Sequence, residues 1–213
     1  MDEVLERLKD GVRKFQMEVY PQRAEIFAQA ANEPQRPQTL FIACADSRVD
    51  PNEITSSSTG DVFVTRNIGN MVPAYGEMLG GVSAVVEFAV SSLGVRHIVV
   101  CGHSDCGAMK ALLAPESTEK MPTVRSWLQN AHAALTVAEA LREHEAEAGH
   151  PRDLLKLLTE QNVLLQMQHL KTHPSVRGAL AAEALTISGW IYEIGSGHVC
   201  VAEDGSQKFT PIG

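Results

Sequence analysis

The chain has 213 residues, of which 44% are hydrophobic and 21% charged, a composition that supports one sizeable core and argues against disorder. Its formal net charge of -8 argues against binding to nucleic acid or an anionic membrane, because both partners require a basic surface. The longest weakly polar stretch, residues 80–93, contains Glu87 and is too short to span a bilayer. The amino-terminal residues show no signal-peptide pattern, so we expect a cytoplasmic protein.

The first 31 residues are predicted to be helical. Apolar residues recur there at helical spacing, and a second helical segment follows over 21–31. The proline-bearing segment 32–38 is typical of a linker into a first strand. We therefore expect a single domain over 1–213, with a helical arm at 1–34 and an α/β core at 35–213.

Three mainly apolar segments are predicted to be strands, at residues 39–45, 61–67 and 97–103. The first is apolar almost throughout, which is typical of parallel strands covered on both faces. A helix over 78–94, ended by Gly94, connects the second and third strands as a β–α–β crossover. The sequence thus predicts an α/β fold with a mostly parallel central sheet flanked by helices.

Helices dominate the next part of the chain. A short helix is predicted from residue 108, followed by two long helices over 123–149 and 151–173, the second stopped by Pro174. The final segment, 185–212, has the pattern of a strand, a turn at 195–197 and a closing strand.

Chemically reactive residues stand at the ends of two predicted strands. Cys44 ends the first strand, and His103 and Cys106 come just after the third. Functional groups of open parallel sheets collect beyond the carboxyl ends of the strands, so these three can meet. One imidazole and two thiolates fill three positions of a tetrahedral zinc site and leave a fourth open, as catalytic zinc requires. Cys101 and Cys200 are predicted to be core thiols instead.

Asp46 and Arg48 follow Cys44 at alternate positions. If this segment stays extended, Cys44, Asp46 and Arg48 face the same side. The arginine can then clamp the aspartate through two hydrogen bonds and keep it ionised. The alternative is a surface ion pair without a function, which contributes under about 1 kcal/mol.

The segments CADSRVDP, GDVFVTRNIGN and VVCGHSDCGAMKALL closely resemble the three motif blocks of the β-class carbonic anhydrases, in their plant-like, open-site subclass. The likeness continues through HPSVRGALAAEALTISGWIYEIGSG and covers nearly all of the chain from Gln35 onward. It implies a carbonate dehydratase, a lyase that reversibly hydrates carbon dioxide to bicarbonate and a proton. It further implies one Zn²⁺ per subunit on Cys44, His103 and Cys106, with zinc-bound hydroxide assisted by the catalytic dyad Asp46 and Arg48.

The resemblance also places a substrate pocket. Its positions fall on Gln35, Phe63 and Phe88, the last where plant-like members often carry a tyrosine. Core packing is an equal alternative for both phenylalanines, and the two roles are compatible. Phe41 stands where one subclass uses a tryptophan to bind bicarbonate while its aspartate closes onto zinc. We therefore expect water, and not Asp46, as the fourth zinc ligand.

The resemblance implies oligomers as well. In this family, amino-terminal arms embrace a neighbouring subunit, and the active site lies at that interface, so we expect a homodimer or a tetramer. Two other functions use the same features. One is hydrolysis of carbonyl sulfide or carbon disulfide on the same zinc scaffold, and the other is a zinc-stabilised binding or bicarbonate-sensing protein, against which Asp46 and Arg48 argue.

Two further patterns have competing interpretations. His169 and His173 stand four apart, as in some zinc sites, but no third ligand accompanies them, so a solvated helix end is expected. Gly69, Gly80 and Gly81 do not form a phosphate-binding pattern. Tight turns and close packing near the metal are the expected roles of these glycines.

Overall fold

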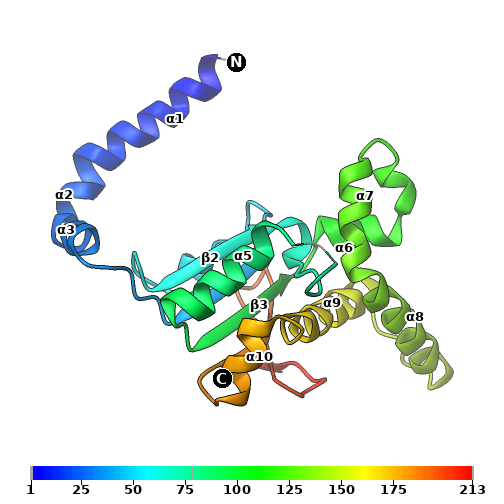
Figure 1. The fold of residues 1–213 in the computed structure, drawn as a ribbon. Coiled ribbons are helices and arrows are strands. Elements are labelled where there is room, and N and C mark those ends of the chain that lie inside the picture. Colours follow the sequence, from blue (N-terminus) through cyan, green and yellow to red (C-terminus); the bar gives the residue numbers. More distant parts are fainter. Residues whose placement is uncertain (1, 78, 213) are drawn as a thin grey trace.

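The computed structural model describes residues 2–77 and 79–212 and has a six-stranded sheet at its centre (Figure 1). The strand order is β2-β1-β3-β4-β5-β6. Strands β2, β1, β3 and β4 run parallel to one another, whereas β5 pairs antiparallel with β4 and β6 pairs antiparallel with β5. The strands are β1 (Thr39–Cys44), β2 (Val62–Asn67), β3 (His97–His103), β4 (Thr186–Tyr192), β5 (Val199–Glu203) and β6 (Thr210–Pro211). The predicted fold class, a mostly parallel sheet flanked by helices, is confirmed.

Ten α-helices, with short π- and 3₁₀-segments between them, make up most of the rest of the described chain. They are α1 (Asp2–Lys14), α2 (Tyr20–Gln22), α3 (Ala24–Asn32), α4 (Pro51–Thr55), α5 (Gly81–Glu87), α6 (Gly107–Leu113), α7 (Pro122–Leu128), α8 (His132–Glu147), α9 (Leu154–Leu170) and α10 (Pro174–Ala181). Across residues 2–77 and 79–212, no helix is both long and apolar enough to cross a membrane.

The main core lies on one face of the sheet. Helices α5, α9 and α10 pack there against side chains of β1, β3 and β4, which alternate along each strand as the pleat requires. Two glycines bring α9 unusually close. A Cβ atom on Gly102 or Gly189 would lie 2.7 or 2.6 Å from a methyl group of Val163. The absence of a side chain at both positions therefore allows α9 to pack this close to β3 and β4.

The amino-terminal helices extend away from the sheet (Figure 1). None of the residues of α1 is buried, and its apolar side chains are exposed to solvent. An amphipathic helix gains little stability in this state, because its apolar face has nothing to cover within the chain. The exposed apolar side chains of residues 4–26 include Val4, Leu5, Leu8, Val12, Phe15, Met17, Val19, Tyr20 and Ile26.

Two helix predictions were wrong. The helix expected over 123–149 is interrupted by a 3₁₀ turn at Gln129–Ala131, which separates α7 from α8. Pro174 does not merely stop a helix. The chain turns at residues 171–173, and Pro174 then begins α10, where its missing N–H has no intrahelical partner to lose. Met78, the first residue of the helix predicted over 78–94, lies outside the described residues.

Candidate metal centre

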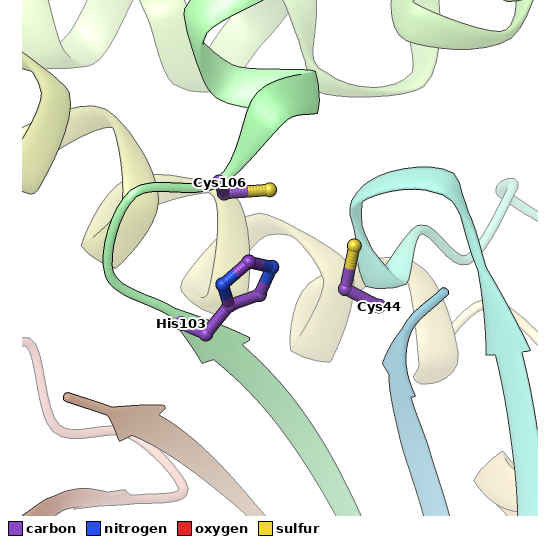
Figure 2. Close-up of side chains that lie close together, drawn as sticks. All are labelled: Cys44, His103 and Cys106. Atoms are coloured by element: carbon purple, nitrogen blue, oxygen red, sulfur yellow. The ribbon is translucent and has the colours of Figure 1, made fainter. Parts of the chain in front are cut away.

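Three ligand side chains meet at the carboxyl edge of the sheet (Figure 2). Cys44 is the last residue of β1, His103 is the last residue of β3, and Cys106 immediately precedes α6. Their ligand atoms all lie within 4.8 Å of one another, and all three residues are buried. The parallel pairing of β1 with β3 brings these residues together although 58 positions separate Cys44 from His103. The cluster can therefore hold a metal ion.

The orientation of His103 fits a metal ligand. Its Nδ1 lies 2.8 Å from the carbonyl oxygen of Ser104, so Nδ1–H donates there and Nε2 keeps its lone pair. Nε2 is buried and has no hydrogen-bond partner among the described residues. A buried polar atom without a partner is costly, and a cation beside it removes that cost. One imidazole and two sulfurs are a donor set that suits zinc.

The two cysteines are electrostatically linked. A hydrogen bond from the Cys106 thiol is the main reason that the pKa of Cys44 lies well below its usual range, against the opposing effect of burial. The pKa of Cys106 is raised, because its thiol donates to Cys44 and its ionisation would add a second negative charge there. A cation between the sulfurs removes this repulsion and favours both thiolates.

A tight turn after β2 completes the wall around Cys44. Gly69 in this turn has a φ of 76°, in the left-handed region, and its backbone N–H helps to lower the pKa of Cys44. A Cβ atom on Gly69 would lie 3.0 Å from Cβ of Ala108. The structure thus bears out the predicted tight turn at this glycine. Gly80 and Gly81 have no atom within 4 Å of such a Cβ, and they show no close packing.

Asp46 is clamped by Arg48 next to the cluster. Nε of Arg48 donates to Oδ1 of Asp46 at 2.9 Å, and Nη2 donates to Oδ2 at 2.8 Å. The clamp holds the pKa of the Asp46 carboxyl well below its usual range. Oδ2 of Asp46 lies 4.0 Å from Nε2 of His103. The carboxylate is therefore ionised and faces the same space as the imidazole.

The clamp arises from a turn and not from the extended segment that was expected. The strand ends at Cys44, and the N–H of Val49 donates to the carbonyl oxygen of Asp46 at 3.0 Å. This turn also lets the backbone N–H of Arg48 donate to Asp46 Oδ1, at 3.0 Å. The expectation of an extended segment was therefore wrong. The side chains of Asp46 and Arg48 meet because the backbone turns between residues 46 and 49.

Sequence reasoning missed two residues that contact this turn. Arg66, near the end of β2, donates to the carbonyl oxygens of Cys44 and Asp46. Asp105, between the two predicted ligands after β3, accepts a 3.0 Å hydrogen bond from Nη1 of Arg48. A charged side chain in a predicted strand, close to its carboxyl end, was a usable signal for Arg66. Asp105 carried no comparable signal.

The residues expected to line a substrate pocket do not converge on the cluster within one chain. Phe63 pairs with Leu40, four residues before Cys44 and so about 13 Å back along the sheet. Its ring lies 6.0 Å from that of Phe88, which is 46% exposed. Gln35 is exposed and lines a surface pocket beside α3.

Phe41 is fully buried on the other face of the sheet, with its ring 5.7 Å from that of Trp190 in an edge-on contact. Cys101 belongs to the same small cluster, and burial raises the pKa of its thiol to about 12. The structure thus places Cys101 in the core as expected. Cys200 on β5 is only half-buried.

The expectation for the histidine pair was wrong. His173 is buried, and its Nε2 lies 3.0 Å from the carbonyl oxygen of Pro73. Nδ1 of His169 lies 2.8 Å from the carbonyl oxygen of Val72. Both side chains therefore bind the backbone of the segment after the Gly69 turn, and they do not form a solvated helix end.

Known proteins show the same architecture. Residues 39–199 match the family model described as carbonic anhydrase. A carbonic anhydrase of Pseudomonas aeruginosa is 45% identical over 203 residues, which cover 95% of this chain and 90% of that protein. One of Synechococcus elongatus is 45% identical over 210 residues, covering 98% of this chain and 75% of that protein.

Solved structures agree with these sequence matches. The β-carbonic anhydrase CcaA superimposes with a TM-score of 0.91 at 38% identity, over 99% of this chain and 93% of that one. A tetrameric β-carbonic anhydrase of the fungus Sordaria macrospora superimposes with a TM-score of 0.78 at 28% identity, over 96% of this chain and 98% of that one. The chain therefore belongs to the β-carbonic anhydrases, a family of lyases also termed carbonate dehydratases.

Proposed function

We propose that the chain uses one Zn²⁺, held by Cys44, His103 and Cys106, to hydrate carbon dioxide reversibly to bicarbonate and a proton. The observation that carries this proposal is the buried Nε2 of His103, which has no hydrogen-bond partner in the described part of the chain and belongs to a cluster whose ligand atoms all lie within 4.8 Å of one another. Zinc at this position supplies Lewis acidity, which lowers the pKa of water towards neutrality.

Asp46 and Arg48 act on the water that attacks the substrate carbon. The ionised Asp46 carboxylate accepts a hydrogen bond from this water and so turns a lone pair towards carbon dioxide. Arg48 keeps the carboxylate charged and fixes its direction through two hydrogen bonds of 2.9 and 2.8 Å. This division of roles explains why both charged groups are placed beside the metal cluster.

Water, and not Asp46, is the fourth ligand in this proposal. Both carboxylate oxygens of Asp46 are engaged by Arg48, and Phe41 lacks the N–H donor that a tryptophan would bring. A crystal structure of the zinc-loaded protein near pH 7 tests this point. We expect Asp46 to remain on Arg48, and coordination of zinc by Asp46 would contradict the proposal.

The substrate pocket forms between two copies of the chain in this proposal. Gln35, Phe63 and Phe88 lie away from the cluster of their own chain, so they serve as pocket residues when a second copy brings them to it. The exposed apolar side chains of residues 4–26 support a homodimer or a tetramer, in which the arm at 1–34 covers the core at 35–213 of a neighbour. Each subunit of this assembly forms a single domain over 1–213, and the enzyme acts in the cytoplasm.

The decisive experiment compares wild type with Asp46→Asn. Stopped-flow hydration of carbon dioxide should be fast in wild type and reduced about 100-fold in the variant, the loss typical of a misplaced catalytic acid or base group. Zinc content, measured by mass spectrometry, should be unchanged.

Release of sulfide from carbonyl sulfide or carbon disulfide is measured on the same samples. Sulfide release without hydration of carbon dioxide would contradict the assignment. Full hydration activity in Asp46→Asn would contradict the role of Asp46 alone.

A further inference from the structure

We propose that Asp105 is a positioning residue, which holds Arg48 through Nη1, the guanidinium nitrogen that does not bind Asp46, and thereby keeps the carboxylate of Asp46 directed at the reacting water. This inference rests on the proposed function of Asp46 and Arg48. It adds a residue that lies between two candidate zinc ligands in sequence but does not itself bind the metal.

Arg48 lies between two carboxylates. Its Nε and Nη2 donate to Asp46, whereas Nη1 donates to Oδ2 of Asp105 at 3.0 Å and Nη2 also approaches the carbonyl oxygen of Asp105 at 3.4 Å. Lys110 on α6 forms an ion pair with the other oxygen, Oδ1, of Asp105. The four charges therefore alternate in sign along one row, from Asp46 through Arg48 and Asp105 to Lys110.

The backbone of Asp105 explains why an aspartate can occupy this position. Its φ is 61°, in the left-handed region that most side chains avoid and that aspartate and asparagine tolerate best. This conformation turns the chain tightly between His103 and Cys106. The side chain of Asp105 contacts Arg48, so the loop that carries two candidate ligands is tied to the turn that carries Asp46.

Arg66 holds the same turn from β2. It donates to the carbonyl oxygens of Cys44 and Asp46, so the backbone position of Asp46 does not depend on Asp105. What depends on Asp105 is the third anchor of the Arg48 side chain, which is 45% exposed; without it, only the hydrogen bonds to Asp46 hold the guanidinium against reorientation in water. Loss of the Asp105 carboxylate should therefore reduce the fraction of molecules in which Asp46 is correctly directed.

The expected effect is modest because these groups are exposed. Asp105 and Lys110 are each 52% exposed, so their charges are screened by solvent. Exposed ion pairs change an equilibrium by up to about fivefold, and we expect kcat of Asp105→Asn to fall by about this factor. KM should stay within about twofold of wild type, because Asp105 orients Arg48 and does not contact carbon dioxide.

The experiment separates this role from a structural role of the loop. Asp105→Asn and Asp105→Gly both tolerate a positive φ but lack the carboxylate, whereas Asp105→Ala also strains the backbone. A positioning role predicts a loss of kcat in both variants with wild-type zinc content, and the loss should be at least as large in the Gly variant, because the amide oxygen of asparagine can still accept from Nη1 of Arg48. If only the Ala variant loses activity, or if the Asn variant loses zinc, Asp105 merely shapes the loop and the proposal is wrong.

Arg48→Ala provides the reference for the coupling. We expect Asp105→Asn to cause no further loss in the Arg48→Ala background, since Asp105 acts through Arg48. An equal loss in both backgrounds would overturn the proposal. If Arg48→Ala itself keeps wild-type kcat, the proposed role of Arg48 fails first, and the two failures are thus distinguishable.

Two controls complete the design. Asp204→Asn removes a comparable exposed aspartate, paired with Lys171, and should keep wild-type kcat. A crystal structure of Asp105→Gly, which lacks any side-chain acceptor for Arg48, gives a readout that does not depend on activity. We expect the guanidinium of Arg48 to leave its wild-type position or to lose its density, and an unchanged, ordered Arg48 would refute the inference.

Discussion

The side-chain amide of Asn162 donates a hydrogen bond of 3.1 Å to the carbonyl oxygen of Gly69. Asn162 lies on α9. Gly69 lies in the turn after β2, and its own backbone N–H donates to the sulfur of Cys44. Gln166, one turn further along α9, donates to Oδ1 of Asn162 at 2.9 Å and accepts from the N–H of Val72 at 2.8 Å. A buried polar network thus connects the helix on the sheet to the wall of the metal centre.

This connection makes the Gly69 turn sensitive to a single methyl group. Gly69→Ala places a Cβ 3.0 Å from Cβ of Ala108 and also forces a positive φ on alanine. We expect the free energy of unfolding to fall by about 3 kcal/mol, from backbone strain and overpacking together. Urea denaturation at fixed zinc and protein concentration measures this change.

Gly60→Ala is the matched control for the Gly69 variant. Gly60 also has a positive φ, 96°, but no atom lies within 4 Å of the added Cβ. Only the backbone strain remains, and the loss should be about 1 kcal/mol. Equal losses in the two variants would show that the turn is not closely packed.

Replacing a thiol of the cluster should remove the metal. Cys44→Ser substitutes a weaker ligand at the end of β1, and we expect loss of zinc together with at least about 100-fold lower activity. Cys200→Ser, on β5, should keep both. Zinc content by mass spectrometry and hydration of carbon dioxide are the measurements, and a Cys44→Ser protein with full zinc would contradict the proposed ligand set.

The buried His173 should contribute to the pH dependence of stability. Burial lowers its pKa in the folded protein below the unfolded value of about 6.5. The stabilisation is therefore present above about pH 6.5 and is lost as the pH falls through the folded pKa, because the unfolded chain then binds more protons.

His173→Gln tests this contribution with a side chain that can still donate to Pro73. We expect the free energy of unfolding to decline less between pH 7 and pH 5 than in wild type, by at most about 1.4 kcal/mol per pH unit for one proton. Urea denaturation at several pH values gives the slopes. Identical slopes in the two proteins would contradict the expectation.

Removal of residues 1–32 should disrupt the assembly. The truncation deletes α1, α2 and α3, whose apolar side chains are exposed in the single chain. If the arm covers a neighbouring subunit as proposed, its removal exposes that surface, so we expect aggregation or at least about 100-fold lower activity. Size-exclusion chromatography with light scattering and the hydration assay are the measurements, and a fully active monomer would refute the proposal.

Local sequence patterns were sufficient for the first three strands and for the cluster, although they did not reveal the short strand β6. The strands at 39–45, 61–67 and 97–103 were predicted to within one residue, because apolar runs of this length bounded by polar residues encode burial directly. The meeting of Cys44 with His103 followed from parallel pairing alone, since it requires only that both strands end at the same edge.

Contacts made by polar side chains were beyond such patterns. The segment after Cys44 forms a turn, although its sequence is equally compatible with an extended strand. His169 and His173 bind carbonyl oxygens of the backbone, although their sequence is equally compatible with a solvated helix end. Which acceptor a polar group reaches depends on the approach of a distant segment and not on its neighbours in sequence.

The sequence by itself therefore predicted the α/β fold, the three candidate metal ligands and the proximity of Asp46 to Arg48, but not the turn through which these two pair. Only the tertiary structure decided that Arg66 binds the backbone of Asp46, that Asp105 binds the side chain of Arg48 and that α9 supports the Gly69 turn. The physical reason is that hydrophobic periodicity is encoded locally, whereas hydrogen bonds between strand ends, loops and helices depend on the register and spacing that the completed sheet imposes.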